Sequence, residues 1–404
     1  MFPAHSAAAS SVAVLLLTIA APAGAAGSTT RVSVSTAGTQ ANGVSFGSAL
    51  SADGRYVAFS SDATNLVPGD TNNAGDVFVR DRRTGTTERV SLSSAGAQGG
   101  EESFGTSITP DGRYVAFASR APNLVPGDTN GQTDAFIRDR RTGTTTRISV
   151  SARGTQGNSE STFPRLSADG RHVAFPSWAT NLIPGDTTAG VFVRGLDSGT
   201  LERVSATGTG ATISGDGRYV AFDTYASNEV PGDTNTSGDV FVRDRQTRTT
   251  TRISVASNGA QADNDSGTAA MTPDGRYVAF DSLASNLVPG DAPGPRAVFV
   301  RDRQTGATSR IAVGTNPALS ADGRYIAFQD RPVDGEHTQV FVRDRHTGTT
   351  TRISIATDGT PANGLSYQAA LSADGRQVAF HSAATNLIPA DTNNTGDIFT
   401  RPTQ

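Results

Sequence analysis

Acidic and amide side chains recur with a fixed spacing at four places in the sequence. They follow the pattern D-x-N-x-x-x-D, and they are Asp70, Asn72 and Asp76; Asp128, Asn130 and Asp134; Asp233, Asn235 and Asp239; and Asp391, Asn393 and Asp397. Oxygen ligands at the first and third positions of a tight loop suit Ca²⁺, which takes roughly six to eight oxygens. The fifth position carries no consistent ligand. The pattern therefore predicts either a partial series of calcium sites or Asx turns that start strands.

These four patterns lie at equivalent places in a repeat. The stretch Asp53-Gly-Arg-Tyr-Val-Ala-Phe59 returns, with small changes, from Asp111, Asp169, Asp216, Asp274, Asp322 and Asp374, which makes seven copies. Each copy has four short segments, which in the first copy span residues 47–51, 56–60, 76–81 and 87–93. Short strands in a repeat of this length are typical of a β-propeller. The sequence predicts an all-β fold, a seven-bladed propeller of four-stranded antiparallel blades.

The two ends of the chain predict how the ring closes. The last copy stops after its third segment, residues 397–401, and residues 31–35 match a fourth segment with no copy before it. We therefore expect the N-terminal strand to complete the last blade, which also removes exposed sheet edges. Residues 27–404 then form a single propeller domain.

The lengths of the connections distinguish the two faces of the predicted ring. The connections between first and second segments, and between third and fourth, are short turns; all the long connections lie at the opposite end. Long loops on a rigid scaffold are the usual place for binding. Five carboxylates there could line the channel opening and act as acid and base on a sugar, namely Glu101, Glu102, Glu160, Asp263 and Asp265. Solvated loop charges are the alternative interpretation. Trp178 starts one of these loops and could be a sugar platform or a rim aromatic.

A second charged motif, Arg80-Asp81-Arg82 with its copies, falls at the short-turn end. The sequence predicts that the Asp caps the turn and that the Arg residues form ordinary surface pairs.

The N-terminal segment and the composition limit where the protein can be located and which partners it can have. Residues 11–20 are apolar and Ala23-Gly-Ala25 matches a signal-peptidase site, so residues 1–26 are expected to be a secretory signal and the protein to be secreted or periplasmic. The sequence contains no Cys, 34 basic and 38 acidic residues, and no second long apolar run. We expect no disulfide, no nucleic-acid partner, no membrane insertion and a monomer.

The repeat Ser-Ala-Asp-Gly-Arg-Tyr-Val-Ala-Phe resembles that of the TolB-like propellers, a WD-like family, and Thr109-Pro-Asp-Gly-Arg113 comes close to the family pattern. The resemblance implies the propeller fold, and the roles known in the family do not transfer with it. We expect a non-catalytic binding or scaffolding module for a protein or cell-envelope polymer, acting through the loop-rich face. Calcium is the one cofactor that the sequence suggests. The alternative is a propeller glycoside hydrolase or lyase that uses the loop carboxylates.

Overall fold

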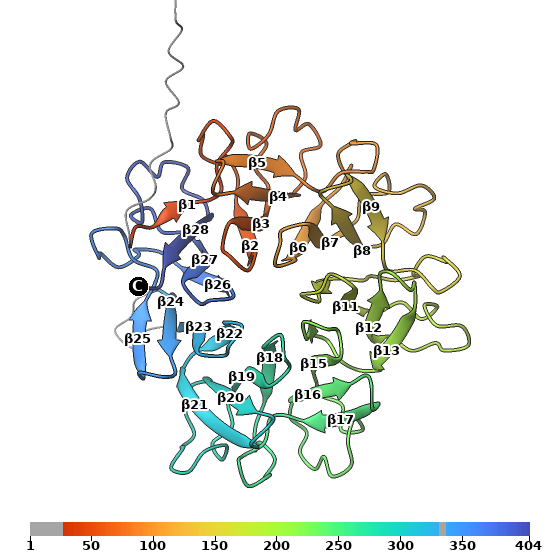
Figure 1. The fold of residues 1–404 in the computed structure, drawn as a ribbon, viewed down its shortest axis with the longest axis vertical. Coiled ribbons are helices and arrows are strands. Elements are labelled where there is room, and N and C mark those ends of the chain that lie inside the picture. The colour runs from red at the N-terminus through yellow and green to blue at the C-terminus, as the bar shows by residue number, and fades with distance from the viewer. Residues whose placement is uncertain (1–26, 331–336) are drawn as a thin grey trace, which may run out of the picture.

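The computed structural model describes residues 27–330 and 337–404, and the expected signal peptide lies outside this range. The described residues form 28 β-strands in seven four-stranded antiparallel sheets, which surround a central opening as the blades of a propeller (Figure 1). The predicted fold class is confirmed. In the described part of the chain, no helix is long and apolar enough to cross a membrane.

Six blades take their strands in chain order from the centre outwards, and the seventh uses both ends of the chain. The strands are, in blade 1, β2 (Ser45–Leu50), β3 (Tyr56–Ser61), β4 (Asp76–Asp81) and β5 (Thr86–Arg89); in blade 2, β6 (Ser103–Ile108), β7 (Tyr114–Ser119), β8 (Asp134–Asp139) and β9 (Thr144–Arg147); in blade 3, β10 (Arg165–Leu166), β11 (His172–Ser177), β12 (Gly190–Gly195) and β13 (Leu201–Ser205); in blade 4, β14 (Thr212–Ile213), β15 (Tyr219–Thr224), β16 (Asp239–Asp244) and β17 (Thr249–Arg252); in blade 5, β18 (Ser266–Met271), β19 (Tyr277–Ser282), β20 (Ala297–Asp302) and β21 (Ala307–Val313); in blade 6, β22 (Thr315–Leu319), β23 (Tyr325–Asp330), β24 (Gln339–Asp344) and β25 (Thr349–Arg352); and in blade 7, β26 (Ser366–Leu371), β27 (Gln377–Ser382), β28 (Asp397–Pro402) and β1 (Thr30–Arg31).

The N-terminal strand closes the ring, as predicted. β1 pairs antiparallel with β28, with Arg31 opposite Phe399. The pairing continues past the strand, because the amide of Val32 donates to the carbonyl of Ile398 at 2.7 Å. Arg31 also forms ion pairs with Asp391 and Asp397, so the closure contains charged as well as backbone contacts.

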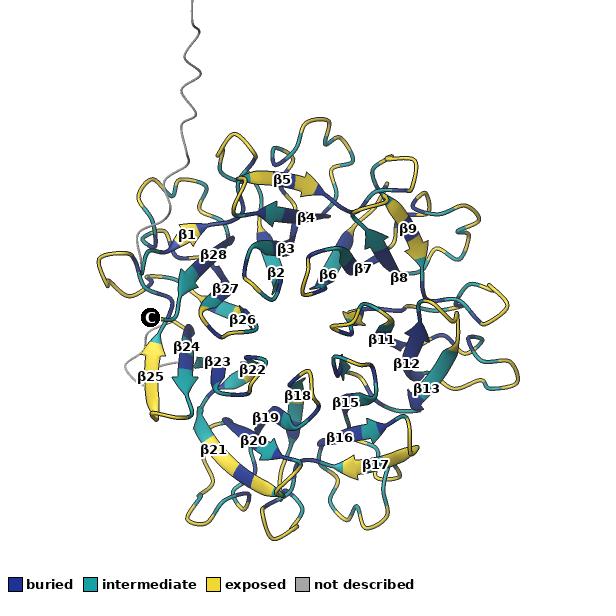
Figure 2. Ribbon diagram, viewed as in Figure 1, coloured by how far each residue is buried: buried dark blue, intermediate teal, exposed yellow. Residues whose placement is uncertain are grey.

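The hydrophobic core lies between the faces of neighbouring blades. The two middle strands of every blade contribute a stacked pair of phenylalanines, such as Phe59 and Phe78 with ring centroids 5.8 Å apart. Val and Ala side chains of the same strands pack against the next blade. This explains the apolar Tyr-Val-Ala-Phe segment, since a strand covered on both sides is apolar on both faces. Figure 2 shows the middle strands buried and the outer strands, such as β5 and β17, largely exposed.

The short turns gather at one end of the ring, which we call the turn face. There Asp81 caps its turn by accepting from the amide of Arg83 at 2.9 Å, as predicted. The arginines, however, do more than form surface pairs: Arg55 pairs with Asp81, and Arg140 of blade 2 stacks on Tyr56 of blade 1 with its guanidinium 4.6 Å from the ring centroid. Arg140, and likewise Arg303 and Arg345, therefore join neighbouring blades, whereas the pair of Arg55 and Asp81 lies within blade 1. The sequence did not indicate this, because the stacking partner belongs to another repeat.

Candidate functional site

The long connections lie at the other end, the loop face, where a channel runs into the ring. This channel has a volume of about 580 Å³, and it is lined by the innermost strands of all the blades and the loops that lead into them. Towards the turn face it narrows to a hollow of about 190 Å³ that is lined almost wholly by apolar residues, among them Leu50, Ile108, Leu166, Ile213 and Leu371. The channel is therefore a funnel that opens on the loop face. We call its opening the mouth; it is formed by the residues that precede the innermost strands and those that follow the second strands.

The innermost strands carry a strained bulge where they line the funnel. Four non-glycine residues have a left-handed backbone there, namely Phe163 (φ 43°), Thr268 (φ 50°), Asn316 (φ 52°) and Gln368 (φ 54°). Gly47 and Gly105 hold the equivalent positions in blades 1 and 2 with φ 63° and 71°. The strand register shifts at this point, for example between Phe46 and Ala49. Bulges and left-handed non-glycine residues cluster at functional sites, so the geometry singles out the funnel.

Hydrogen bonds link these bulges from blade to blade. The amide of Gly47 donates to the Oε1 atom of Gln368 at 3.2 Å, and the hydroxyl of Thr106 donates to the carbonyl of Gly47 at 2.6 Å. The guanidinium of Arg165 then donates to the carbonyl of Thr106 at 3.1 Å. Three neighbouring contacts across blades 7, 1, 2 and 3 thus hold the funnel wall in one arrangement.

The funnel wall bears an uneven set of charges. Asp223 and Asp281 lie in a side pocket of about 350 Å³ between blades 4 and 5, which Asp265 and Arg296 also line. Asp281 is 2% exposed and pairs with Arg296 at 2.6 Å. Burial raises the pKa of Asp223; the hydrogen bond from the Thr209 hydroxyl opposes this rise, and the Asp281 carboxylate adds to it. Asp223 is half-buried, and a carboxyl with a raised pKa in a pocket marks a candidate ligand-binding or proton-transfer group.

Of the five loop carboxylates proposed from the sequence, Asp265 lines this pocket. Its side chain also accepts from the amide of Gly238 at 2.9 Å. Glu101 is exposed and lies 3.9 Å from Arg120, while Glu102 and Glu160 are exposed at the mouth. Asp263 accepts from the backbone and hydroxyl of a serine in the next loop, so it orders that loop. The structure therefore does not bring the five together as an acid–base pair.

Exposed aromatic residues flank the mouth in blades 3 and 4. Phe163 is 53% exposed, Trp178 is 50% exposed and Tyr225 is 71% exposed. Phe163 packs edge-on against Phe104 of blade 2, with ring centroids 5.9 Å apart. Trp178 is thus a rim residue with half of its surface free.

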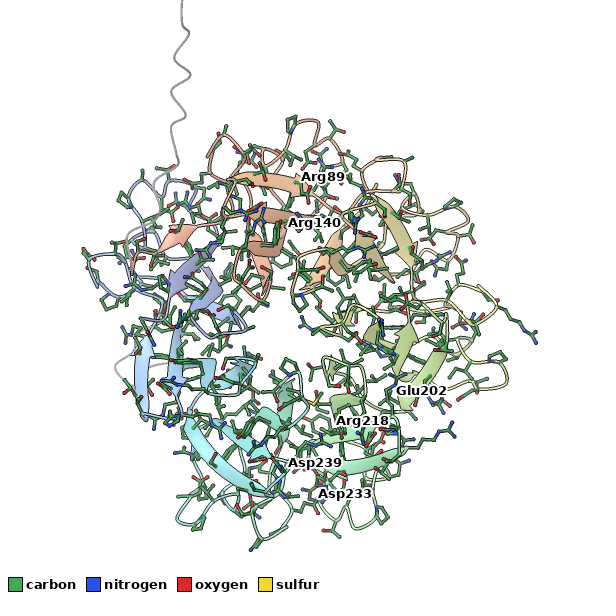
Figure 3. All side chains as sticks on the ribbon, viewed as in Figure 1. Arg89, Arg140, Glu202, Arg218, Asp233 and Asp239 are labelled. Carbon is green, nitrogen blue, oxygen red and sulfur yellow. The ribbon has the colours of Figure 1, made fainter. Side chains whose placement is uncertain are left out.

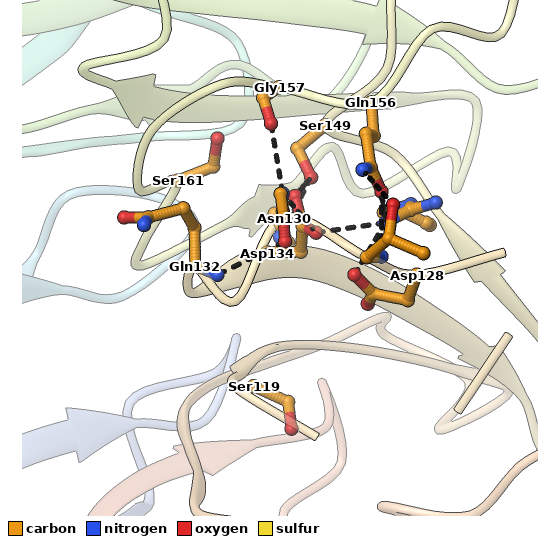
Figure 4. Close-up of polar contacts among 12 residues, drawn as sticks. Ser119, Asp128, Asn130, Gln132, Asp134, Ser149, Gln156, Gly157 and Ser161 are labelled. Carbon is orange, nitrogen blue, oxygen red and sulfur yellow. Dashed lines mark hydrogen bonds and ion pairs between the residues drawn. The ribbon is translucent and has the colours of Figure 1, made fainter. Parts of the chain in front are cut away.

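The D-x-N-x-x-x-D loops lie in the outer part of the blades, away from the funnel. Figure 4 shows the second copy, with Asp128, Asn130 and Asp134. The guanidinium of Arg147 reaches Asp128 and Asp134 at 3.0 Å each. Asn130 donates its amide N–H to Asp134 at 3.1 Å and to a backbone carbonyl at 2.9 Å, and its oxygen accepts from the amide of Gln132 at 3.0 Å. This is an Asx turn that is combined with an ion pair.

The other three copies share the ion-pair arrangement. The arginine lies at the end of the outermost strand, and its copies are Arg89, Arg252 and Arg31, each between two aspartates. Figure 3 places Asp233 and Asp239 in the outer part of blade 4 and Arg89 in the same part of blade 1. Burial raises the pKa of Asp76 to about 6, against the hydrogen bond from Ser91 and the charge of Arg89.

These loops, as folded, do not fit a calcium ion. The guanidinium already reaches both carboxylates, and where Asn72, Asn130 and Asn393 face the second aspartate they present N–H rather than oxygen. In residues 27–330 and 337–404, no group of three or more His, Cys, Asp or Glu side chains is placed to hold a metal. Calcium binding at the four loops stays a prediction, and it requires the arginine to move.

The residues that the sequence reasoning missed are Asp223 and Asp281. Both occupy the position directly after Tyr-Val-Ala-Phe, which varies more than its neighbours between the seven copies. That variability is the signal that could have identified them, since the rest of the strand is nearly constant.

Comparisons with known proteins concern the fold. The chain is similar to an oligogalacturonate lyase of Vibrio parahaemolyticus at 12% identity, over 95% of both chains, with a TM-score of 0.60. It is also similar to the β-propeller domain of the Trilobed protease from Pyrococcus furiosus at 8% identity, over 89% of this chain and 95% of that one, with a TM-score of 0.57. TolB of Acinetobacter baumannii matches at 16% identity over 87% of this chain and 81% of that chain, with a TM-score of 0.44.

No protein-family model matches the chain, and no curated protein sequence matches it. At identities this low, similar structures share a fold and carry no chemistry with it. The seven-bladed propeller fold that the repeat predicted is confirmed.

Proposed function

We propose that this protein is an exported, non-catalytic binding module that holds a protein or cell-envelope polymer at the mouth of its funnel. The distribution of exposed apolar side chains carries the proposal. The large hydrophobic residues that are exposed in the described chain are Val44, Phe163, Trp178, Tyr225 and Leu365. Every one of them lies within two residues of the loop-face end of a first or second strand. Exposed apolar side chains gathered at one place mark interaction sites.

Three further features support this proposal. The bulged funnel wall is held in one arrangement, the loops that surround it are long, and the apolar segment within residues 1–26 is typical of an exported protein. The propeller supplies the rigid frame and the mouth supplies the contact surface.

The test is a co-sedimentation experiment with insoluble cell-envelope material and purified residues 27–404. We expect the protein to sediment with this material, and the double substitution Trp178→Ser with Tyr225→Ser to abolish the association. Arg83→Ala, at an exposed side chain of the turn face, is the matched control and should sediment like the wild type. Equal sedimentation of all three proteins would refute binding at the mouth.

A polysaccharide-cleaving enzyme is the second candidate, and Asp223 is the observation that favours it. A general acid needs a carboxyl group with a raised pKa inside a pocket, and Asp223 has both properties. If the protein cleaves a polysaccharide, Asp223→Asn should abolish the activity and leave the unfolding curve unchanged. Cleavage that survives this substitution would exclude Asp223 as the acid.

A further inference from the structure

The mouth and funnel carry an excess of negative charge. Among the described residues there, the carboxylates are Asp62, Glu101, Glu102, Glu160, Asp223, Asp265 and Asp281, and the arginines are Arg120, Arg165 and Arg296. Arg120 lies near Glu101 and Arg296 pairs with Asp281, so these two arginines are already matched. The field at the opening is therefore negative, although the whole chain is nearly neutral.

The side pocket has the shape and chemistry to accept a cationic side chain. Its Asp281 already binds the guanidinium of Arg296 at 2.6 Å, so this wall accommodates the planar group. Asp223 lines the same pocket, and no arginine of residues 27–330 and 337–404 forms an ion pair with it. The Thr209 hydroxyl donates to its Oδ2 atom at 3.1 Å. A second cation placed there would relieve the cost of a desolvated carboxylate.

The apolar part of the mouth lies beside this pocket. Tyr225 lines the pocket itself, and its ring passes over Gly238, where an added Cβ would lie 3.2 Å from the Tyr225 Cζ atom. Phe163 and Trp178 project from the neighbouring blade 3. A ligand that matches both features has positive charges and apolar side chains close together.

We propose that the mouth binds a basic segment of a partner protein, with an Arg or Lys side chain in the pocket of Asp223, Asp265 and Asp281 and apolar residues against Tyr225 and Trp178. This inference rests on the proposed function and narrows it to one class of partner. An anionic polymer does not fit, because the carboxylates would repel it.

The test uses fluorescence anisotropy with two short labelled peptides. One alternates Arg with Leu and Tyr, and the other has Glu in place of every Arg. We expect residues 27–404 to bind the basic peptide, more weakly at high salt, and to leave the acidic peptide free. Asp223→Asn should weaken binding of the basic peptide at least about tenfold. Asp197→Asn, which removes an 82% exposed carboxylate on the turn face, should leave it unchanged.

Equal binding of the two peptides, or an unchanged affinity in Asp223→Asn, would overturn the inference. Thermal unfolding of Asp223→Asn ensures that the variant is folded. The inference and the proposed function can also fail separately. If envelope material still sediments with the wild type and is lost in the Trp178→Ser/Tyr225→Ser variant, but the basic peptide does not bind, the mouth is a binding site for a different class of ligand. If neither ligand binds, both proposals fall.

Discussion

Arg89 offers the sharpest test of what holds the outer part of each blade. Its guanidinium is 5% exposed and lies 3.5 Å from Asp70 and 3.2 Å from Asp76, whose side chains are 1% and 0% exposed. The substitution Arg89→Met keeps much of the side-chain volume and removes the charge. Two buried carboxylates are then left without a cation. Breaking a buried ion pair in this way costs about 3–5 kcal/mol, and we expect that loss in the free energy of unfolding at neutral pH.

The pH dependence of this loss has a definite sign. The pKa of Asp76 is raised from 3.8 to about 6, so the folded state holds this proton more tightly than the unfolded state. Its contribution to stability is therefore fully present below pH 3.8 and is lost as the pH rises through about 6; at neutral pH the difference amounts to about 3 kcal/mol. Without Arg89 the pKa rises further. The deficit of the variant should therefore be smaller near about pH 5 than at neutral pH.

Urea unfolding of the wild type and the variant at these two pH values measures both quantities. Arg83→Met, which removes an exposed guanidinium, is the control and should change stability by at most about 1 kcal/mol. Asp76→Asn added to Arg89→Met should recover part of the loss, because it removes one uncompensated charge. A loss below about 1 kcal/mol, or a larger loss at acidic than at neutral pH, would refute the assignment of Arg89 as the buried counter-ion.

Three further measurements test other parts of the structure. Thermal unfolding of residues 27–404 in EDTA and in millimolar Ca²⁺ should give coincident curves; a higher Tm with calcium that is lost in Asp70→Ala would instead establish calcium in the loops. Gly112→Ala should destabilise the fold by about 1–3 kcal/mol more than Gly96→Ala, since both have a positive φ but only the Cβ at position 112 would meet a side chain, the ring of Tyr56; equal losses would refute the blade contact. Burial lowers the pKa of His381 to about 4, so its contribution to stability is present above pH 6.5 and is lost as the pH falls towards 4, by about 3 kcal/mol. His381→Gln, which copies Gln329 of blade 6, should reduce this acid sensitivity, and an unchanged acid midpoint in urea would contradict it.

The fold could be predicted from the sequence because every blade repeats the same solution. Asp53 binds the amide of Arg55 in its turn, and Val57 and Phe59 are completely buried between blades. These contacts are made with residues of the same copy or of the adjoining copy, so the repeated sequence pattern shows them directly. The closing strand could be predicted for the same reason, since Arg31 stands where Arg89 and Arg147 stand in other blades.

The loop chemistry could not be predicted as well, because the arginine that pairs with the two aspartates lies outside the loop pattern. The D-x-N-x-x-x-D pattern shows oxygen ligands and gives no sign of the cation that meets them. Arg147 reaches Asp134 from the next strand, and Arg31 reaches Asp397 from the opposite end of the sequence. A local pattern of acidic residues therefore admits both a metal ion and an arginine, and tertiary structure distinguishes them.

The candidate site lies where the repeat ceases to be regular. The residue after Tyr-Val-Ala-Phe and its variants is Ser60, Ala118, Pro176, Asp223, Asp281, Gln329 or His381 in the seven blades. The residues before it are held constant because they pack between blades, where a change of volume is costly. This position instead lines the funnel or its side pocket in blades 3, 4 and 5. Positions that differ between otherwise near-identical blades are the ones through which a propeller can bind an asymmetric ligand. At this position the negative charges of Asp223 and Asp281 set blades 4 and 5 apart from the others, and they lie beside the exposed aromatic residues of blades 3 and 4.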